Sequence, residues 1–364
     1  MSSSRNSSAA RARSFLIVCF RFLGDVLVTT PLAVSIKQAI PDAEIDYLVF
    51  QGTEGILFHN PLIRKIITVP GKGNYAFLLM TLFRKYDVAF AAYPSDRTAL
   101  AAAVAGKRSI GLTYKRKNEW WKDVVLGSAL YCNDSQHVVA NVLSLLAPLG
   151  IPAVPRVAMG YDDSDLDFAK KNMPEGKYVV LHPYSRNRRK YWPAENWGRL
   201  AGLLHEQTGL IAVFTTTPDS ADTEYLREIL SSSPSDVMAF KEPCSLTQLA
   251  AVIKGSAAFV GIDTAVTHIA AALEVPTVAL FGPSMTRYWG PWPNGCEEAS
   301  PLAAHGGVQH IASVTVIQKD WECVPCNRET CAISTRNKME CLEAISPKEV
   351  FREVMDSVIG HHQG

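Results

Sequence analysis

Residues 259–283 constrain the fold more than any other stretch of the sequence. Residues 257–262 and 275–281 are apolar runs, and each is short enough for a strand that is buried in a parallel sheet. Between these runs, apolar side chains such as Val266 and Ile269 recur at helical spacing. The stretch therefore predicts a strand, a turn, a helix and a second strand, the repeating unit of parallel sheets that helices cover.

The turn before this helix carries polar side chains. Asp263 and Thr264 are residue types that cap helices, and His268 lies in the first turns. Because the first amides of a helix lack internal partners and the helix dipole is positive there, the turn predicts a site for a nucleotide phosphate. A capped helix whose histidine is satisfied by local hydrogen bonds is the alternative.

Composition narrows the class of protein. A chain of 364 residues with 48% hydrophobic and 20% charged residues predicts a globular protein with room for two domains. The net charge of +1 argues against a general polyanion binder, so we expect no nucleic-acid partner. No apolar run approaches the roughly eighteen residues of a membrane-spanning helix, and we expect a protein that is not integral to a membrane.

Short apolar runs alternate with helical stretches along the whole chain. Strands are predicted at residues 15–20, 45–50, 66–69, 88–93, 178–182 and 211–215, with helices near residues 32–39, 75–85, 97–105, 137–149 and 222–230. Turn formers at residues 150–155 mark a boundary between two such series. The expected fold class is α/β, with two Rossmann-like domains built on parallel sheets.

Two further strand-to-helix turns carry candidate binding groups. Gly24 and Asp25 follow the first predicted strand, where Gly24 permits a close ligand and Asp25 places a carboxylate at the strand end. An aspartate that only caps its helix is the alternative. In the second half, Ser185 precedes four cations within five residues, at a position suited to a phosphate. These cations are Arg186, Arg188, Arg189 and Lys190.

Two segments outside these turns also stand out. Residues 113–123 interleave Lys115, Arg116, Lys117 and Lys122 with aromatic rings, a pattern that suits an anionic acceptor, a membrane surface or a solvated loop. Near the end, four cysteines have the spacing of a four-thiolate metal site, although reduced cysteines in a compact loop are the alternative. They are Cys323, Cys326, Cys331 and Cys341. Eight cysteines without a secretory signal favour reduced thiols or metal ligands in a cytoplasmic protein.

Three ordered motifs carry a resemblance to a known family. They are Gly24-Asp25 with Thr29-Thr30-Pro31, Lys190-Tyr191-Trp192 with Trp197, and Asp263-Thr264 with His268, Ala270-Ala271 and Leu280-Phe281-Gly282. In this order and spacing the chain resembles glycosyltransferase family 9, the ADP-heptose:lipopolysaccharide heptosyltransferases, over about residues 15–358. The opening from Arg21 to Asp25 and the segment from Arg287 to Trp292 are most similar to the type that adds the third inner-core heptose.

The resemblance implies the GT-B architecture, in which two Rossmann-like domains face a central cleft. It implies an acceptor domain at residues 15–160 and a donor domain at residues 161–345, while the Ser-, Ala- and Arg-rich residues 1–14 predict a disordered tail and residues 346–364 a C-terminal helix and tail. The implied substrates are ADP-heptose and the phosphorylated inner core of lipopolysaccharide. The implied location is cytoplasmic, peripheral on the inner face of the inner membrane.

The resemblance also implies site residues and an inverting transfer that needs no metal. Asp25 would be the general base, and Lys190 would stabilise the ADP leaving group. The implied donor-binding set is Gly24, Ser185, Arg186, Lys190, Asp263, Thr264, Ala265 and His268. The cations Lys115, Arg116, Lys117 and Lys122 are left for the acceptor, and the four cysteines for a structural zinc or iron.

Two departures from the family pattern leave details open. Many relatives have glycine where this chain has Ala265, and relatives often bind the ribose through a glutamate where this chain offers only Asp219 or Asp222. A transferase that acts on another acceptor, such as an autotransporter protein, is an alternative function. A nucleotide-binding assembly module without transfer is a third, against which the retention of Asp25 and Lys190 argues.

Overall fold

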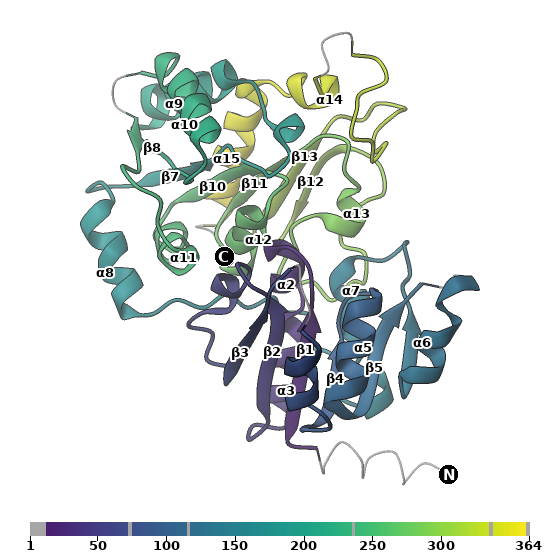
Figure 1. Cartoon of the computed structure of the whole chain (residues 1–364). Coiled ribbons are helices and arrows are strands. Elements are labelled where there is room, and N and C mark those ends of the chain that lie inside the picture. Colours follow the sequence, from purple (N-terminus) through teal and green to yellow (C-terminus); the bar gives the residue numbers. More distant parts are fainter. Residues whose placement is uncertain (1–11, 72–74, 115–116, 235–236, 335–337, 362–364) are drawn as a thin grey trace. The chain divides into compact units, whose positions relative to one another are not determined.

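The structure is a computed structural model that describes residues 12–71, 75–114, 117–234, 237–334 and 338–361. It divides the chain into two compact units, residues 1–160 and 161–364 (Figure 1). Most of the predicted N-terminal tail lies outside the described residues. Its last residues are ordered, because Ala12 is buried and Ser14 begins the first strand.

The first unit contains a six-stranded parallel sheet in the order β3-β2-β1-β4-β5-β6 (Figure 1). Its strands are β1 (Ser14–Cys19), β2 (Glu44–Phe50), β3 (Lys65–Val69), β4 (Tyr86–Ala91), β5 (Gly106–Thr113) and β6 (Ser128–Tyr131). Its α-helices are α2 (Leu23–Leu27), α3 (Thr30–Ala39), α4 (Ala76–Thr81), α5 (Asp96–Ala105), α6 (Trp120–Val125) and α7 (Val138–Ser144). Short 3-10 turns are η1 (Glu54–Leu57), η2 (Lys117–Glu119) and η3 (Ala147–Leu149).

Helices cover both faces of this sheet. The chain runs from β1 outward to β3, then returns past β1 to β4 and continues to β6. Because crossovers between parallel strands are right-handed, α4, α5 and α6 cover the face opposite α3. The contacts agree, since α3 packs against α7, whereas α5 packs against α4 and α6. The central strand β1 is buried on both sides, as its continuous apolar sequence predicts.

The second unit contains a seven-stranded sheet in the order β12-β13-β11-β10-β7-β8-β9. Its strands are β7 (Tyr178–His182), β8 (Ile211–Phe214), β9 (Met238–Ala239), β10 (Ala258–Ile262), β11 (Thr277–Phe281), β12 (Gly307–Ile311) and β13 (Val314–Gln318). Its helices are α8 (Asp163–Asn172), η4 (Arg188–Lys190), α9 (Ala194–Thr208), α10 (Ser220–Ser231), α11 (Leu246–Lys254), α12 (Ala265–Ala272), α13 (Thr286–Trp289), α14 (Glu340–Glu343) and α15 (Pro347–His361). The pairs are parallel except for the terminal hairpin of β12 and β13.

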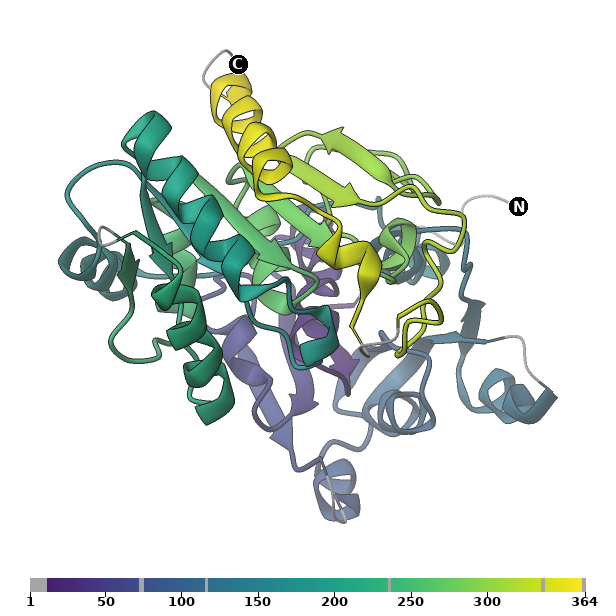
Figure 2. The same cartoon turned by 90° about the horizontal axis from the view of Figure 1, so that it is seen from above.

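Helix α15 completes the core of the second unit. Its Val350 and Val354 are fully buried. The helix lies beside α9 (Figure 2). Trp192 and Trp197 fill the same core, with ring centroids 5.1 Å apart, and the Trp192 indole donates to the carbonyl of Ile345 at 2.9 Å. These contacts fix the chain directly after η4.

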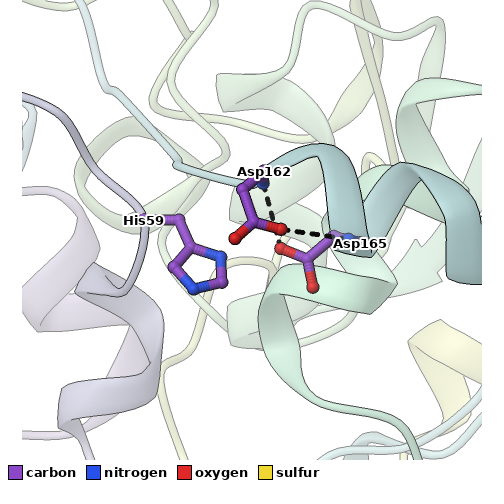
Figure 3. Close-up of side chains that lie close together, drawn as sticks. All are labelled: His59, Asp162 and Asp165. Atoms are coloured by element: carbon purple, nitrogen blue, oxygen red, sulfur yellow. Dashed lines mark hydrogen bonds between the residues drawn. The ribbon is translucent and has the colours of Figure 1, made fainter.

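The second unit begins with helix α8, and two aspartate side chains cap the start of this helix. Asp162 and Asp165 form a capping box at the start of α8, in which each side chain accepts from the backbone amide of the other (Figure 3). The Asp165 carboxylate also accepts from Thr247, at the start of α11, at 3.0 Å. His59, which is also drawn in Figure 3, belongs to the first unit.

The predicted α/β class with parallel sheets is confirmed. The main differences between the predicted and the observed elements lie where strands and helices alternate less regularly in the sequence. The basic segment near residue 120 forms α6 followed by β6, and the chain after β11 adds the antiparallel hairpin. Among the described helices, none combines the length and the apolar character that crossing a membrane requires.

Candidate active site

Both sheets reverse their strand order at a point that open α/β sheets use to bind ligands. In the first sheet the reversal lies between β1 and β4, and in the second between β7 and β10. Asp25 follows β1, Lys190 follows β7, and Asp263 follows β10. The topology therefore brings the turns of Lys190 and Asp263 together, and it places Asp25 at the corresponding position of the other unit.

Asp25 lies in the first turn of α2, and its carboxyl group is mostly buried. The Asp25 side chain is 13% exposed, and its Oδ1 lies 3.7 Å from Nε of Arg21. Burial raises the pKa of Asp25, whereas the Arg21 charge and a backbone hydrogen bond from Phe22 lower it. A carboxylate with a raised pKa is a better proton acceptor, as a general base requires.

Arg21 is a site residue that the sequence analysis did not assign. Its guanidinium lies over the ring of Tyr93, 4.6 Å from the centroid, and over the ring of Phe22 at 4.9 Å. Tyr93 follows β4, the other strand at the reversal. The spacing of four residues between Arg21 and Asp25 was the available signal, because side chains at that spacing meet on a helical turn.

In the second unit, Lys190 pairs directly with Asp263. Nζ of Lys190 lies 2.5 Å from Oδ2 of Asp263, and the side chains are 28% and 13% exposed. Ser185 donates to the backbone carbonyl of Asp263 at 3.3 Å. The structure thus joins three predicted donor-site residues in one cluster, with the lysine partly open to solvent.

The cluster contains a fourth member, Ser284, which the sequence analysis missed. Its hydroxyl donates to Oδ2 of Asp263 at 2.5 Å. Gln318 holds the backbone there, since its amide donates to the carbonyls of Gly282 at 2.7 Å and Ser284 at 2.9 Å. Gln318 is the last residue of β13, so no local pattern in the sequence links it to Asp263.

The N-terminus of α12 has no side-chain cap. Thr264 occupies the N-cap position, but neither it nor Asp263 caps the helix with its side chain. Asp263 is occupied by Lys190 and Ser284 instead. Ala265 begins the helix and is not among the described residues with positive φ, so alanine is compatible with this turn.

His268 is half-buried on the first turns of α12. Its Nδ1 has no hydrogen-bond partner among the described residues. Burial and the Lys190 charge lower the pKa of His268, whereas the Asp263 carboxylate raises it. The net direction is downward, so the imidazole is neutral at pH 7 and offers a hydrogen bond and no charge.

The two aspartates considered for ribose binding, which follow β8, both have partners within the second unit. Asp222 accepts from Tyr191 at 2.5 Å and from Thr217 at 2.6 Å, so both of its carboxylate oxygens are occupied. Asp219 caps α10 and lies 3.3 Å from Arg188. Thr216 is different, because its buried hydroxyl has no partner among the described residues. Arg186 is exposed on the turn that follows β7.

The predicted acceptor residues divide into two groups. Lys115 and Arg116 lie outside the described residues, and Lys117 begins η2. Lys122 is buried, and its Nζ lies 3.0 Å from Asp96 and 3.3 Å from Glu119. The structure therefore assigns Lys122 to holding α6 against α5, in place of the predicted acceptor contact.

The four predicted metal ligands line one cavity in the second unit. The cavity has a volume of about 310 Å³, and Pro283, Trp321 and Met339 also line it. Burial raises the pKa of Cys341 to about 11, and the neighbouring thiolates add to that rise. Such thiols suit a soft metal ion, whose charge would remove the repulsion between thiolates.

The fold and these groups define a class of protein. Two Rossmann-like units, with a carboxylate at the reversal of one sheet and a cationic turn beside an open helix N-terminus at the other, are the elements of a GT-B glycosyltransferase that uses a nucleotide sugar. A family model described as glycosyltransferase family 9 (heptosyltransferase) matches residues 78–301. The chain belongs to glycosyltransferase family 9.

Individual relatives agree. The chain is 30% identical over 291 residues to lipopolysaccharide heptosyltransferase 3 of Escherichia coli, covering 75% of this chain and 85% of the relative. It is 27% identical to lipopolysaccharide heptosyltransferase 1 of Pseudomonas aeruginosa, covering 87% and 86%.

Solved structures show the same fold. A family 9 glycosyltransferase from Veillonella parvula has a TM-score of 0.76 at 18% identity, covering 96% of this chain and 97% of that one. E. coli heptosyltransferase WaaC with ADP has a TM-score of 0.70 at 20% identity, covering 94% and 99%.

Proposed function

We propose that this protein transfers a heptose from ADP-heptose to the inner core of lipopolysaccharide, with inversion at the anomeric carbon. The observation that carries the proposal is the Lys190–Asp263 pair beside the open N-terminus of α12, in a chain of family 9 that keeps Asp25 at the matching turn. The printed names of the relatives, lipopolysaccharide heptosyltransferases 3 and 1, support this choice of acceptor.

The residues divide the chemistry between them. Asp25 accepts the proton from the attacking acceptor hydroxyl, and its raised pKa favours that step. Lys190, Ser185 and the first amides of α12 receive the negative charge that develops on the departing diphosphate. Gly24, Thr264, Ala265, Arg186 and His268 complete the proposed donor and base turns. This set of charges supports a transfer step that needs no metal.

One experiment tests the proposal. Purified protein is incubated with ADP-heptose and delipidated core oligosaccharide, and the products are analysed by mass spectrometry. We expect a gain of one heptose and the release of ADP. Release of ADP only when another acceptor is supplied would favour the alternative acceptor, and ADP binding without transfer to any acceptor would favour an assembly module.

We also propose that the cations before α6 contact the phosphorylated acceptor. Replacing Lys115, Arg116 and Lys117 by Gln should raise the KM for acceptor and leave the KM for ADP-heptose unchanged. The effect should be largest at low salt, because the Debye length is about 8 Å at physiological ionic strength. Steady-state kinetics at two salt concentrations measure it. Lys122→Gln is the control, since it should lower thermal stability without this salt-dependent effect.

The location proposed for the enzyme is the cytoplasmic side of the inner membrane, as a peripheral protein. A lipid-anchored acceptor requires contact with that surface, and no described helix could span it. The proposal is therefore attachment at the surface.

The four cysteines are proposed to hold one structural zinc or iron ion. The support is that all four line one cavity; no three of their sulfur atoms lie within 4.8 Å of one another in the described chain, so an ion would draw the loop together and displace the thiol protons. Elemental analysis of protein purified without chelator should find about one ion per chain. Cys326→Ser should lower that content severalfold, whereas Cys244→Ser, outside the cavity, should not. Metal near zero in the parent protein contradicts the proposal.

A further inference from the structure

Helix α4 presents an apolar surface on both of its sides. Leu78 and Leu79 pack against the core of the first unit. On the opposite side Phe77, Met80 and Phe83 are 80%, 73% and 64% exposed. A helix that is apolar all round is expected to be buried, and exposed apolar clusters mark interaction surfaces.

The apolar surface extends over the neighbouring helices of the same face. Helix α5 packs between α4 and α6, and exposed apolar side chains occur on all three. We call this set the α4–α6 apolar face, and it consists of Phe77, Met80, Phe83, Leu100, Trp120 and Val124. Most of the exposed large apolar side chains of the described residues lie in the first unit. Figure 2 shows α4 projecting at the lower edge of the picture.

The charges directly beside α4 are positive. No residue between Tyr75 and Phe83 is charged, and Arg84 and Lys85 follow directly. Both are exposed and form no ion pair among the described residues. On the neighbouring helices Asp96 pairs with Lys122, whereas Asp123 keeps its negative charge, because its hydrogen bond of 3.3 Å comes from the neutral hydroxyl of Tyr131.

We propose that the α4–α6 apolar face docks on a lipid bilayer that contains anionic headgroups. Aromatic side chains favour the boundary between headgroups and acyl chains, and cations directly beside them attract anionic lipids. An aromatic and apolar cluster with unpaired cations matches that chemistry better than it matches a second protein surface. The proposal specifies where the peripheral attachment proposed above takes place, and it rests on that function.

The position of α4 connects the face to the proposed base. Tyr75, which precedes α4, packs its ring 5.9 Å from that of Phe20, and Phe20 follows β1 directly before Arg21. The carbonyl of Gly71 accepts from Arg97 of α5 at 2.9 Å, which holds Gly71 against α5. The start of α4 therefore lies at the edge of the sheet that carries the Asp25 turn, and its end, where Arg84 donates to the carbonyl of Val104, leads to the opposite edge.

Co-sedimentation with vesicles tests the proposal. The full chain is mixed with vesicles of phosphatidylethanolamine and phosphatidylglycerol at 7:3, and the partition coefficient is measured. The triple variant Phe77→Ser, Met80→Ser and Phe83→Ser should lower it at least about tenfold. Arg84→Gln with Lys85→Gln should lower it about fivefold per cation on these vesicles and very little on neutral phosphatidylcholine. Ile359→Ser, which removes an exposed side chain from α15, is the matched control and should not change it.

Two further measurements separate the outcomes. The triple variant should keep the parent melting temperature and its transfer to delipidated oligosaccharide, because none of the three residues touches the proposed site. If the parent protein transfers no heptose to delipidated oligosaccharide, the proposed function is contradicted, whereas the docking surface is not. Unchanged vesicle binding in the triple variant overturns the docking proposal. So does sedimentation velocity that finds the parent dimeric and the triple variant monomeric while vesicle binding persists.

Discussion

Asp25→Asn is expected to lower kcat by about 10² to 10⁴, the usual effect of removing a general base. The asparagine keeps the size of the side chain but cannot accept the proton from the acceptor hydroxyl. ADP affinity should stay within about twofold, because the proposed diphosphate contacts belong to the Lys190 cluster of the second unit, whereas Asp25 belongs to the first. Stopped assays with saturating acceptor, together with calorimetry for ADP, measure the two effects.

The pH dependence gives a second measurement of the same role. A base acts only when deprotonated, so kcat/KM should fall as the pH drops through the pKa of Asp25. The Arg21 charge lowers that pKa, and Arg21→Gln removes it. The acidic limb of the profile should therefore move to higher pH in this variant.

Asp42→Asn is the control, because this aspartate is exposed in the same unit. A kcat for Asp25→Asn equal to that of the parent would leave Asp25 with only a structural role in α2. A loss of activity together with a lowered melting temperature would require Asp25→Glu as a further variant. A catalytic base should show partial activity in that variant.

Lys190→Ala is expected to weaken ADP binding by about 10- to 100-fold. A hydrogen bond to a charged group is worth about 1.5 to 3 kcal/mol, and Lys190 is the cation that lies closest to the turn before α12. The loss should extend to kcat, because more charge develops on the diphosphate as it departs. Calorimetry with ADP and steady-state kinetics measure both.

A matched ion pair provides the control. Lys319 pairs with Glu349 at 2.7 Å, and the two side chains are 22% and 19% exposed, close to the values for Lys190 and Asp263. Lys319→Ala should leave ADP affinity unchanged. His268→Ala should weaken ADP binding only about two- to tenfold, because a neutral imidazole contributes about 0.5 to 1.5 kcal/mol. Unchanged affinity in the Lys190 variant would place the donor site elsewhere.

Sequence alone located the turns of the candidate site because the strands before them are short, apolar and buried. The runs before Asp25, Ser185 and Asp263 all form strands of the expected sheets. The spacing of apolar residues and the residue types that favour a turn are both local signals. A few residues around each turn are therefore sufficient to predict the turn.

The contacts within the site were not predictable in the same way. Ser284 reaches Asp263 only because β11 pairs with β10, and Gln318 holds the backbone of Ser284 only because β13 lies on the other side of β11. Asp222 was a candidate for ribose until the structure showed it occupied by Tyr191 and Thr217. Such pairings depend on register between strands, which a single sequence does not specify.

Lys122 shows why the burial of a charged residue could not be predicted from the sequence. A lysine in a basic, aromatic segment normally lies in solvent, since burying an unpaired ammonium is costly. Here Glu119 and Asp96 supply two carboxylates, the second from α5, and the lysine is buried although Asp96 itself is 70% exposed. Only the tertiary contact between α5 and α6 makes this arrangement possible.

The reversal of strand order affects how acceptor specificity can diverge among the enzymes of this family. The turn of Asp25 follows β1, with Tyr93 beyond β4 beside it, and η1 between β2 and β3 also packs against α2. The segment that joins β5 to β6 instead lies at the periphery of the sheet and can lengthen, shorten or be exchanged without moving Asp25. Grafting this peripheral segment of one family member onto another should therefore transfer acceptor preference while the proposed catalytic groups stay in place.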